Sequence, residues 1–272
     1  MILYLALYII IFFLGASIGS FIGAIASRLN PKKKSNISFP KIFLTRSRCD
    51  NCGKILKPVE LIPLLSYIFQ KGKCTKCKSK INMSLFWLEI ISGFTFFIPF
   101  YLFFQFQQYT LEFVLVGLLL SFFFIYLGYF DYLYWEVPVY LILFAFIVFS
   151  VSYIFLYFFG KIELIKIVEY FLSGITGVSV IVALIALSKG RGLGFGDAWI
   201  FGLVGFILGW KGLIVVFFLS TVVGSLIGLL KAIFVNQKIK GTMIQFIPFI
   251  SLGFIIAYFE HQIVFNMLFP YL

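Results

Sequence analysis

Long apolar runs dominate the pattern of hydrophobic and polar positions along the 272 residues. Several runs reach the roughly 18 to 20 apolar residues that a helix needs to cross a bilayer. The runs are continuous rather than alternating, which favours helices over the strands of a transmembrane barrel. The pattern predicts about eight helices: Ile2–Ala26, Ser84–Phe104, Leu111–Phe130, Pro138–Phe159, Ile167–Leu187, Ala198–Leu208, Leu213–Leu230 and Met243–Phe259. An apolar tail, Ile263–Leu272, is too short to span.

The expected fold class is therefore an all-α polytopic membrane protein. We expect a first transmembrane helix at 1–26, a small polar insert at 27–83 and a transmembrane core at 84–272. The segment 1–26 lacks the positive start of a secretory signal, and its apolar run is longer than such signals carry. We interpret it as a first span whose N-terminus lies outside.

Composition supports a membrane location, because 62% of the residues are hydrophobic and only 12% are charged. Of the 22 Lys and Arg residues, 14 lie between Arg28 and Lys80. A basic segment suits nucleic acid or a loop retained in the cytoplasm, and the apolar context favours the loop and the bilayer as partner. If the insert is cytoplasmic, alternating spans place 19 basic residues inside and three outside. The charge pattern thus predicts a multi-pass protein of the inner (cytoplasmic) membrane.

All four cysteines lie in the insert, as Cys49-Asp50-Asn51-Cys52 and Cys74-Thr75-Lys76-Cys77. Two CxxC turns separated by 21 residues aim four thiolates at one point, which is typical of a closed structural zinc site. The alternative is two disulfides or a redox pair, which a cytoplasmic location disfavours. We therefore predict that zinc is bound by Cys49, Cys52, Cys74 and Cys77.

Two of the three aspartates, Asp131 and Asp197, lie at the edges of apolar runs. Ionisable residues at a membrane edge are functional candidates. The predicted topology places both on the cytoplasmic side at similar depth. Two carboxylates that share one proton can activate a water and polarise a peptide carbonyl. We predict a catalytic pair; the alternative is two unrelated interfacial acids.

Glycines mark two further features. Gly190, Gly192, Gly194 and Gly196 precede Asp197, and Gly194 and Gly196 are expected to give a substrate backbone space to approach. Gly15, Gly19 and Gly23 recur at every fourth position of the first helix, which predicts a face for close helix packing. Glu89, near the start of the second helix, is expected to pair with a lysine of the insert or to serve function.

In combination these motifs resemble the prepilin peptidases, also called type IV leader peptidases, which are membrane aspartic proteases of the GxGD type. The resemblance rests on motifs along most of the chain: Gly15-Ala16-Ser17-Ile18-Gly19-Ser20-Phe21, Arg46-Ser47-Arg48-Cys49, Ile62-Pro63-Leu64-Leu65-Ser66-Tyr67, Ile81 to Glu89, Gly194-Phe195-Gly196-Asp197 and Gln245-Phe246-Ile247-Pro248-Phe249. One departure is Trp199, where the family usually has lysine.

The resemblance implies that Asp131 and Asp197 are the catalytic pair and that prepilins or pilin-like proteins are the substrates. Members cut on the cytoplasmic side after a short basic leader, and many N-methylate the new N-terminus with S-adenosylmethionine. Two rival functions remain open at this point: a membrane thiol oxidoreductase that uses the CxxC pairs, and a non-catalytic membrane assembly protein.

Overall fold

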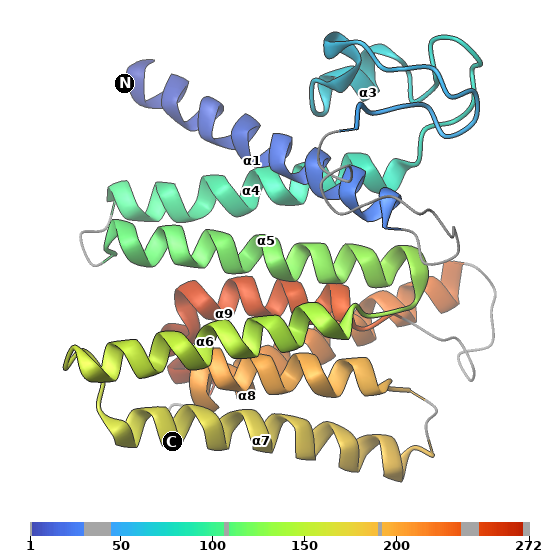
Figure 1. Ribbon diagram of the computed structural model, residues 1–272. Helices are drawn as coiled ribbons and strands as arrows, with labels where there is room; N and C mark the ends of the chain where they lie inside the picture. The colour runs from blue at the N-terminus through green and yellow to red at the C-terminus, as the bar shows by residue number, and fades with distance from the viewer. Residues whose placement is uncertain (1, 30–44, 106–108, 190–191, 235–244, 269–272) are drawn as a thin grey trace. The chain divides into compact units, whose positions relative to one another are not determined.

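The computed structural model describes residues 2–29, 45–105, 109–189, 192–234 and 245–268. These residues form helices, with two isolated β-bridges in the insert. The elements in chain order (Figure 1) are α1 (Ile2–Arg28), η1 (Pro58–Leu61), α3 (Leu65–Phe69), α4 (Met83–Gln105), α5 (Leu111–Tyr134), α6 (Val139–Phe158), α7 (Leu164–Leu187), α8 (Phe195–Phe234) and α9 (Ile247–Leu268). The chain divides into two compact units, residues 1–129 and 130–272.

Six helices of the described residues, α1 and α4 to α8, are long and apolar enough to cross a membrane. Helices suit these sequences because no water inside a bilayer can satisfy free backbone N–H and C=O groups. In α9 the apolar stretch Ile247–Phe259 is shorter. The prediction of an all-α polytopic membrane protein is confirmed, with a helix count close to the expected one.

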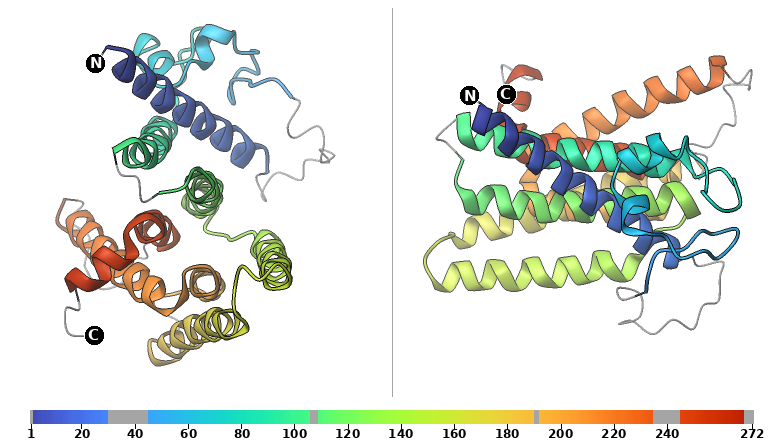
Figure 2. Two further views of the ribbon diagram at one scale, coloured as in Figure 1. Left: turned by 90° about the vertical axis from the view of Figure 1, so that its left-hand side faces the viewer. Right: turned by 90° about the horizontal axis from the view of Figure 1, so that it is seen from above.

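In the first unit, α1 crosses α4 obliquely (Figure 2). A Cβ at Gly15 would lie 2.6 Å from Phe96 Cβ, and one at Gly19 would lie 2.6 Å from Ser92 Oγ. The glycine face predicted on the first helix is therefore a close-packing face, which lets the two backbones approach.

A buried carboxylate fastens the insert to α4. Glu89 is 8% exposed, and its Oε2 accepts a hydrogen bond from the Leu64 N–H at 2.7 Å. Leu64 sits at φ 62° and ψ −53°, and the Leu65 N–H donates to the Pro63 C=O across it, which makes a γ-turn. Among the described residues, the partners of Glu89 are thus this backbone amide and the Ser20 side chain of α1, whereas the sequence suggested a lysine of the insert or a functional role.

In the second unit, α8 packs against α7 and α9 and also touches α6. Small residues allow the contact between α7 and α8, because a Cβ at Gly177 would lie 2.6 Å from the Phe201 carbonyl oxygen. Close backbone approach of this kind replaces the hydrophobic effect, which gives little attraction between helices in lipid.

The predicted helices Ala198–Leu208 and Leu213–Leu230 are joined in α8, but the chain breaks at Gly209. Its φ of 71° and ψ of −174° fall in a region that only glycine adopts readily. In the turn before the break, the hydroxyl of Tyr153 on α6 donates to the Phe206 carbonyl at 2.8 Å. This bond satisfies a carbonyl where the regular helical ladder is interrupted.

The last helix differs from its prediction. α9 continues to Leu268, so the residues from 263 to 268 extend the helix and do not form a separate tail. Phe265 is buried, and its ring packs against that of Trp210 at 5.4 Å between centroids, so tertiary contacts support the longer helix. Residues 269–272 of the predicted tail lie outside the described residues.

Candidate active site and metal centre

Asp131 lies in the last turn of α5, which ends at Tyr134. Its side chain is buried, and the backbone N–H of Ile247, the first residue of α9, donates a hydrogen bond to its carboxylate. The positive end of a helix therefore faces this carboxylate and offsets part of the cost of burying it. The Oδ2 atom of Asp131 has no hydrogen-bond partner among the described residues.

Gln245 holds the backbone around Asp131. Its Nε2 donates to the carbonyl of Asp131 at 2.6 Å and to that of Tyr132 at 2.9 Å. Both carbonyls belong to the last turn of α5, and that of Asp131 also accepts the Trp135 N–H at 2.8 Å, so Gln245 adds a second hydrogen bond there. The sequence placed Gln245 only within a motif, because a contact between residues 114 positions apart leaves no local signal.

Asp197 is the third residue of α8. Its Oδ2 accepts a hydrogen bond from the Gly194 N–H at 2.8 Å, and its own N–H donates to the Gly194 carbonyl at 3.0 Å. An acidic side chain in the first turn of a helix is favoured by the helix dipole and by the free N–H groups there. The glycine string thus ends in a helix start that fixes this carboxylate.

The second unit brings the two aspartates together. Each is 7% exposed, and the charges of the two carboxylates interact. The segment after α5 reaches the start of α8, because a Cβ at Gly196 would lie 2.5 Å from Val137 Cγ2. The Asp131 carboxylate faces the N-terminus of α9, and the Asp197 carboxylate lies in the first turn of α8. The two buried carboxylates therefore lie near each other.

The two glycines predicted to receive a substrate backbone differ in their surroundings. Val137 fills the space beside Gly196. Among the described residues, a Cβ at Gly194 would meet Asp197 Oδ2 at 3.8 Å and the Gly196 nitrogen at 3.9 Å, and one at Gly192 would meet no atom within 4 Å. The open space thus lies at Gly192 and Gly194, while Gly190 lies outside the described residues.

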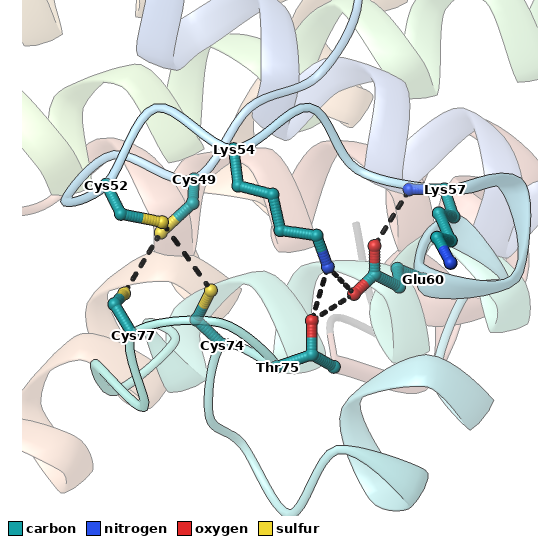
Figure 3. Close-up of polar contacts among 8 residues, drawn as sticks. All are labelled: Cys49, Cys52, Lys54, Lys57, Glu60, Cys74, Thr75 and Cys77. Carbon is teal, nitrogen blue, oxygen red and sulfur yellow. Dashed lines mark hydrogen bonds and ion pairs between the residues drawn. The ribbon is translucent and has the colours of Figure 1, made fainter.

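The four cysteines converge in the insert (Figure 3). All four sulfurs lie within 4.8 Å of one another, with 3.8 Å between Cys49 and Cys77 and 4.0 Å between Cys52 and Cys74. Bonded disulfide sulfurs would be about 2 Å apart. A tetrahedral zinc tetrathiolate with Zn–S bonds of about 2.3 Å places its sulfurs roughly 3.8 Å apart. The separations suit a four-thiolate metal centre.

Two similar turns present the thiols. The Gly53 N–H donates to the Cys49 carbonyl at 3.0 Å, and the Lys78 N–H donates to the Cys74 carbonyl at 3.0 Å. Gly53 and Lys78 occupy equivalent positions, with φ of 66° and 58°. Hydrogen bonds from the Ser79 hydroxyl and N–H lower the pKa of the Cys77 thiol to about 6, which favours the thiolate that a metal needs.

A second polar network lies beside this centre (Figure 3). The Glu60 carboxylate accepts hydrogen bonds from Lys54 Nζ at 2.7 Å, from the Lys57 N–H at 2.8 Å and from the Thr75 hydroxyl. The bond from Lys54, followed by those from Lys57 and Thr75, lowers the pKa of Glu60 to about 2. Glu60 is therefore ionised and ties the two halves of the insert together.

Comparison with known proteins covers both units. Residues 13–103 match the model of the bacterial peptidase A24 N-terminal domain, and residues 118–229 match that of the type IV leader peptidase family. A prepilin leader peptidase/N-methyltransferase of Bacillus subtilis is 31% identical over 252 residues, which are 92% of each chain. The chain belongs to the type IV leader peptidase family. The family resemblance found in the sequence is confirmed.

Two further prepilin leader peptidase/N-methyltransferases match shorter stretches. That of Vibrio cholerae is 36% identical over 114 residues, 41% of this chain and 44% of its own length. That of Myxococcus xanthus is 34% identical over 89 residues, 33% of this chain and 24% of its own. No solved structure matches. The type IV leader peptidase match contains both Asp131 and Asp197, and also Trp199, which is 41% exposed on α8.

Proposed function

We propose that this chain is a membrane aspartic endopeptidase that removes the basic leader of type IV prepilins or pilin-like proteins. The supporting observation is the meeting of Asp131 and Asp197, two buried carboxylates whose charges interact, with one oxygen unpartnered among the described residues. A buried acceptor without a hydrogen bond destabilises the folded protein, so a partner is expected at this atom. In the proposed site, a proton or a water held at Asp131 Oδ2 is that partner.

In this mechanism the two carboxylates share one proton, because like charges at close range do not both ionise. The ionised carboxylate takes a proton from water, and the water oxygen attacks the peptide carbonyl. The protonated carboxyl donates its hydrogen to the carbonyl oxygen. A proton then passes to the departing amine as the C–N bond breaks. The substrate backbone is proposed to lie along the open side of Gly194, while Gly196 serves the contact with Val137.

We propose zinc as the metal of the four-cysteine centre, held by Cys49, Cys52, Cys74 and Cys77. Four thiolates leave no open position for water, so the zinc supplies a structural cross-link of the 27–83 insert. The insert and both aspartates are proposed to face the cytoplasm, with the N-terminus outside. The domain division at 1–26, 27–83 and 84–272 belongs to the same proposal.

The relatives' name also suggests N-methylation with S-adenosylmethionine. The lysine-lined pocket of the insert does not suit the sulfonium cation of that cofactor, because like charges repel. The proposal of methylation therefore rests on the name of the relatives.

The test replaces each aspartate by asparagine in purified protein and measures cleavage of a prepilin in detergent. Both Asp131→Asn and Asp197→Asn should lower the rate at least about 100-fold, because each variant loses an acid–base group. Glu136→Gln is the matched control, since Glu136 is an exposed carboxylate in the segment between α5 and α6. Mass spectrometry of the new N-terminus reports cleavage and methylation together. Normal cleavage by either asparagine variant would exclude the two-aspartate mechanism and favour the non-catalytic rival.

A further inference from the structure

An open pocket of about 560 Å³ lies in the insert beside the four-cysteine centre. This volume is within the range of small-ligand sites. The lining residues are Lys54, Lys57, Val59, Glu60, Thr75 and Lys76. Of these, Lys54, Glu60 and Thr75 contact one another next to Cys74 (Figure 3). Neither the cleavage chemistry nor the metal centre uses this pocket.

The charges that line the pocket are unbalanced. Glu60 is neutralised by Lys54 at 2.7 Å. The ammonium groups of Lys57 and Lys76 form no hydrogen bond or ion pair with any described residue. The pocket therefore presents two uncompensated positive charges. Residues 45–83 contain nine Lys and Arg against two acidic residues, so the surroundings stay positive even beside a dianionic zinc tetrathiolate.

The position of the pocket in the chain indicates its ligand. The insert follows α1 and precedes α4, both of which can span a membrane, so both its ends are held at a bilayer surface. Several apolar side chains of the insert are exposed: Val59 at 70%, Ile68 at 57% and Phe69 at 78%. Exposed apolar residues among lysines are typical of a surface that enters the headgroup region of anionic membranes.

We propose that this pocket binds the phosphate of an anionic phospholipid headgroup through Lys57 and Lys76, with Val59 against the lipid. Lysine ammonium groups bind phosphate as point charges. Attraction to an anionic surface adds to the binding because the insert cannot leave the bilayer. Binding of this kind would hold the insert against the membrane. The inference does not depend on the proposed peptidase mechanism.

The experiment uses the full zinc-loaded chain in an uncharged detergent. Monomeric short-chain phosphatidylglycerol, short-chain phosphatidylcholine and inorganic phosphate are titrated separately, and bound ligand is counted by native mass spectrometry. We expect phosphatidylglycerol to bind, and Lys57→Gln/Lys76→Gln to weaken it about 10- to 30-fold. Lys57→Arg/Lys76→Arg should retain the binding.

The matched control is Lys73→Gln/Lys80→Gln, which removes two exposed charges of the same insert outside the pocket. It should change the affinity by no more than about threefold, because exposed charges that do not line the pocket act on the ligand through screening solvent. Equal weakening in both double variants, or no binding of phosphatidylglycerol, would overturn the proposal. Inorganic phosphate that binds as tightly as the lipid would identify a soluble phosphate as the ligand and reject the lipid. Zinc content, measured for every variant, confirms that the insert is folded.

Discussion

Gly194 and Gly196 flank the same helix start but meet different surroundings. A side chain at position 196 collides with Val137, whereas one at position 194 has space. The first glycine is therefore suited to a ligand, and the second to a packing contact inside the protein. This difference separates two roles that the sequence assigned jointly.

Substitution by alanine tests this distinction. Gly196→Ala should destabilise the site by about 1 to 3 kcal/mol through overpacking, and Val137→Ala in the same chain should restore much of the lost cleavage. Gly194→Ala should leave thermal stability unchanged and raise the KM for prepilin, with no rescue by Val137→Ala. Cleavage kinetics and melting curves in detergent measure both effects. Equal rescue of the two variants would show that position 194 is also a packing position.

Among the elements, the two cysteine turns form a natural comparison, because Gly53 and Lys78 take the same left-handed conformation. That conformation costs a residue with a side chain roughly 1 to 2 kcal/mol. A glycine at this position lowers the stability of the fold by about 0.4 to 1 kcal/mol, because it gives the unfolded chain more conformational freedom. The strain at Lys78 costs more than the unfolded-chain entropy at Gly53, so the second turn is the less stable of the two.

Gly53→Ala should accordingly weaken zinc retention, and Lys78→Gly should strengthen it by roughly 0.5 to 1 kcal/mol, which is a two- to fivefold change in affinity. Competition with a chelator measures this. Lys78→Gln removes the charge but keeps the strain, and should show no gain. A gain in the glutamine variant would trace the effect to charge.

At the scale of the whole molecule, the insert and the membrane helices have different sources of stability. In residues 45–82, the described part of the insert, the helices are the short η1 and α3, of four and five residues, so a metal cross-link should supply much of its folding energy. Purified protein should contain about one zinc per chain. A chelator should then expose residues 45–82 to protease while the helical circular dichroism signal is largely kept.

Replacing Cys52 by serine should have the same effect as the chelator. Zinc well below one per chain, together with oxidised thiols, would contradict the metal centre and revive the oxidoreductase reading.

Much of this architecture follows from sequence, because a bilayer forces apolar runs into helices and a paired CxxC pattern forces four thiols together. The interruption near Gly209 was also predictable from the glycines and Lys211 around it. The approach of Gln245 and Ile247 to Asp131 was not, since it depends on how α9 packs. The bond from Leu64 to Glu89 escaped prediction for the same reason, because it joins a loop to a distant helix.

The break at Gly209 leaves a first arm of α8, Phe195–Leu208, that is 14 residues long. At 1.5 Å per residue this arm measures about 21 Å, against a hydrocarbon thickness of roughly 30 Å. If this arm is a span of its own, as the sequence predicted for Ala198–Leu208, the hydrophobic mismatch is relieved when the bilayer thins around it. Asp197 lies at one end of this arm, so local thinning would bring water to this proposed catalytic carboxylate.

Cleavage in proteoliposomes should therefore depend on acyl-chain length, with the highest rate in the thinner bilayers and a decline as the chains lengthen. The Glu136→Gln protein should follow the same profile. A rate independent of chain length would mean that water reaches Asp197 without any deformation of the lipid. If the dependence holds, the thickness of the host membrane itself regulates the rate of proteolysis.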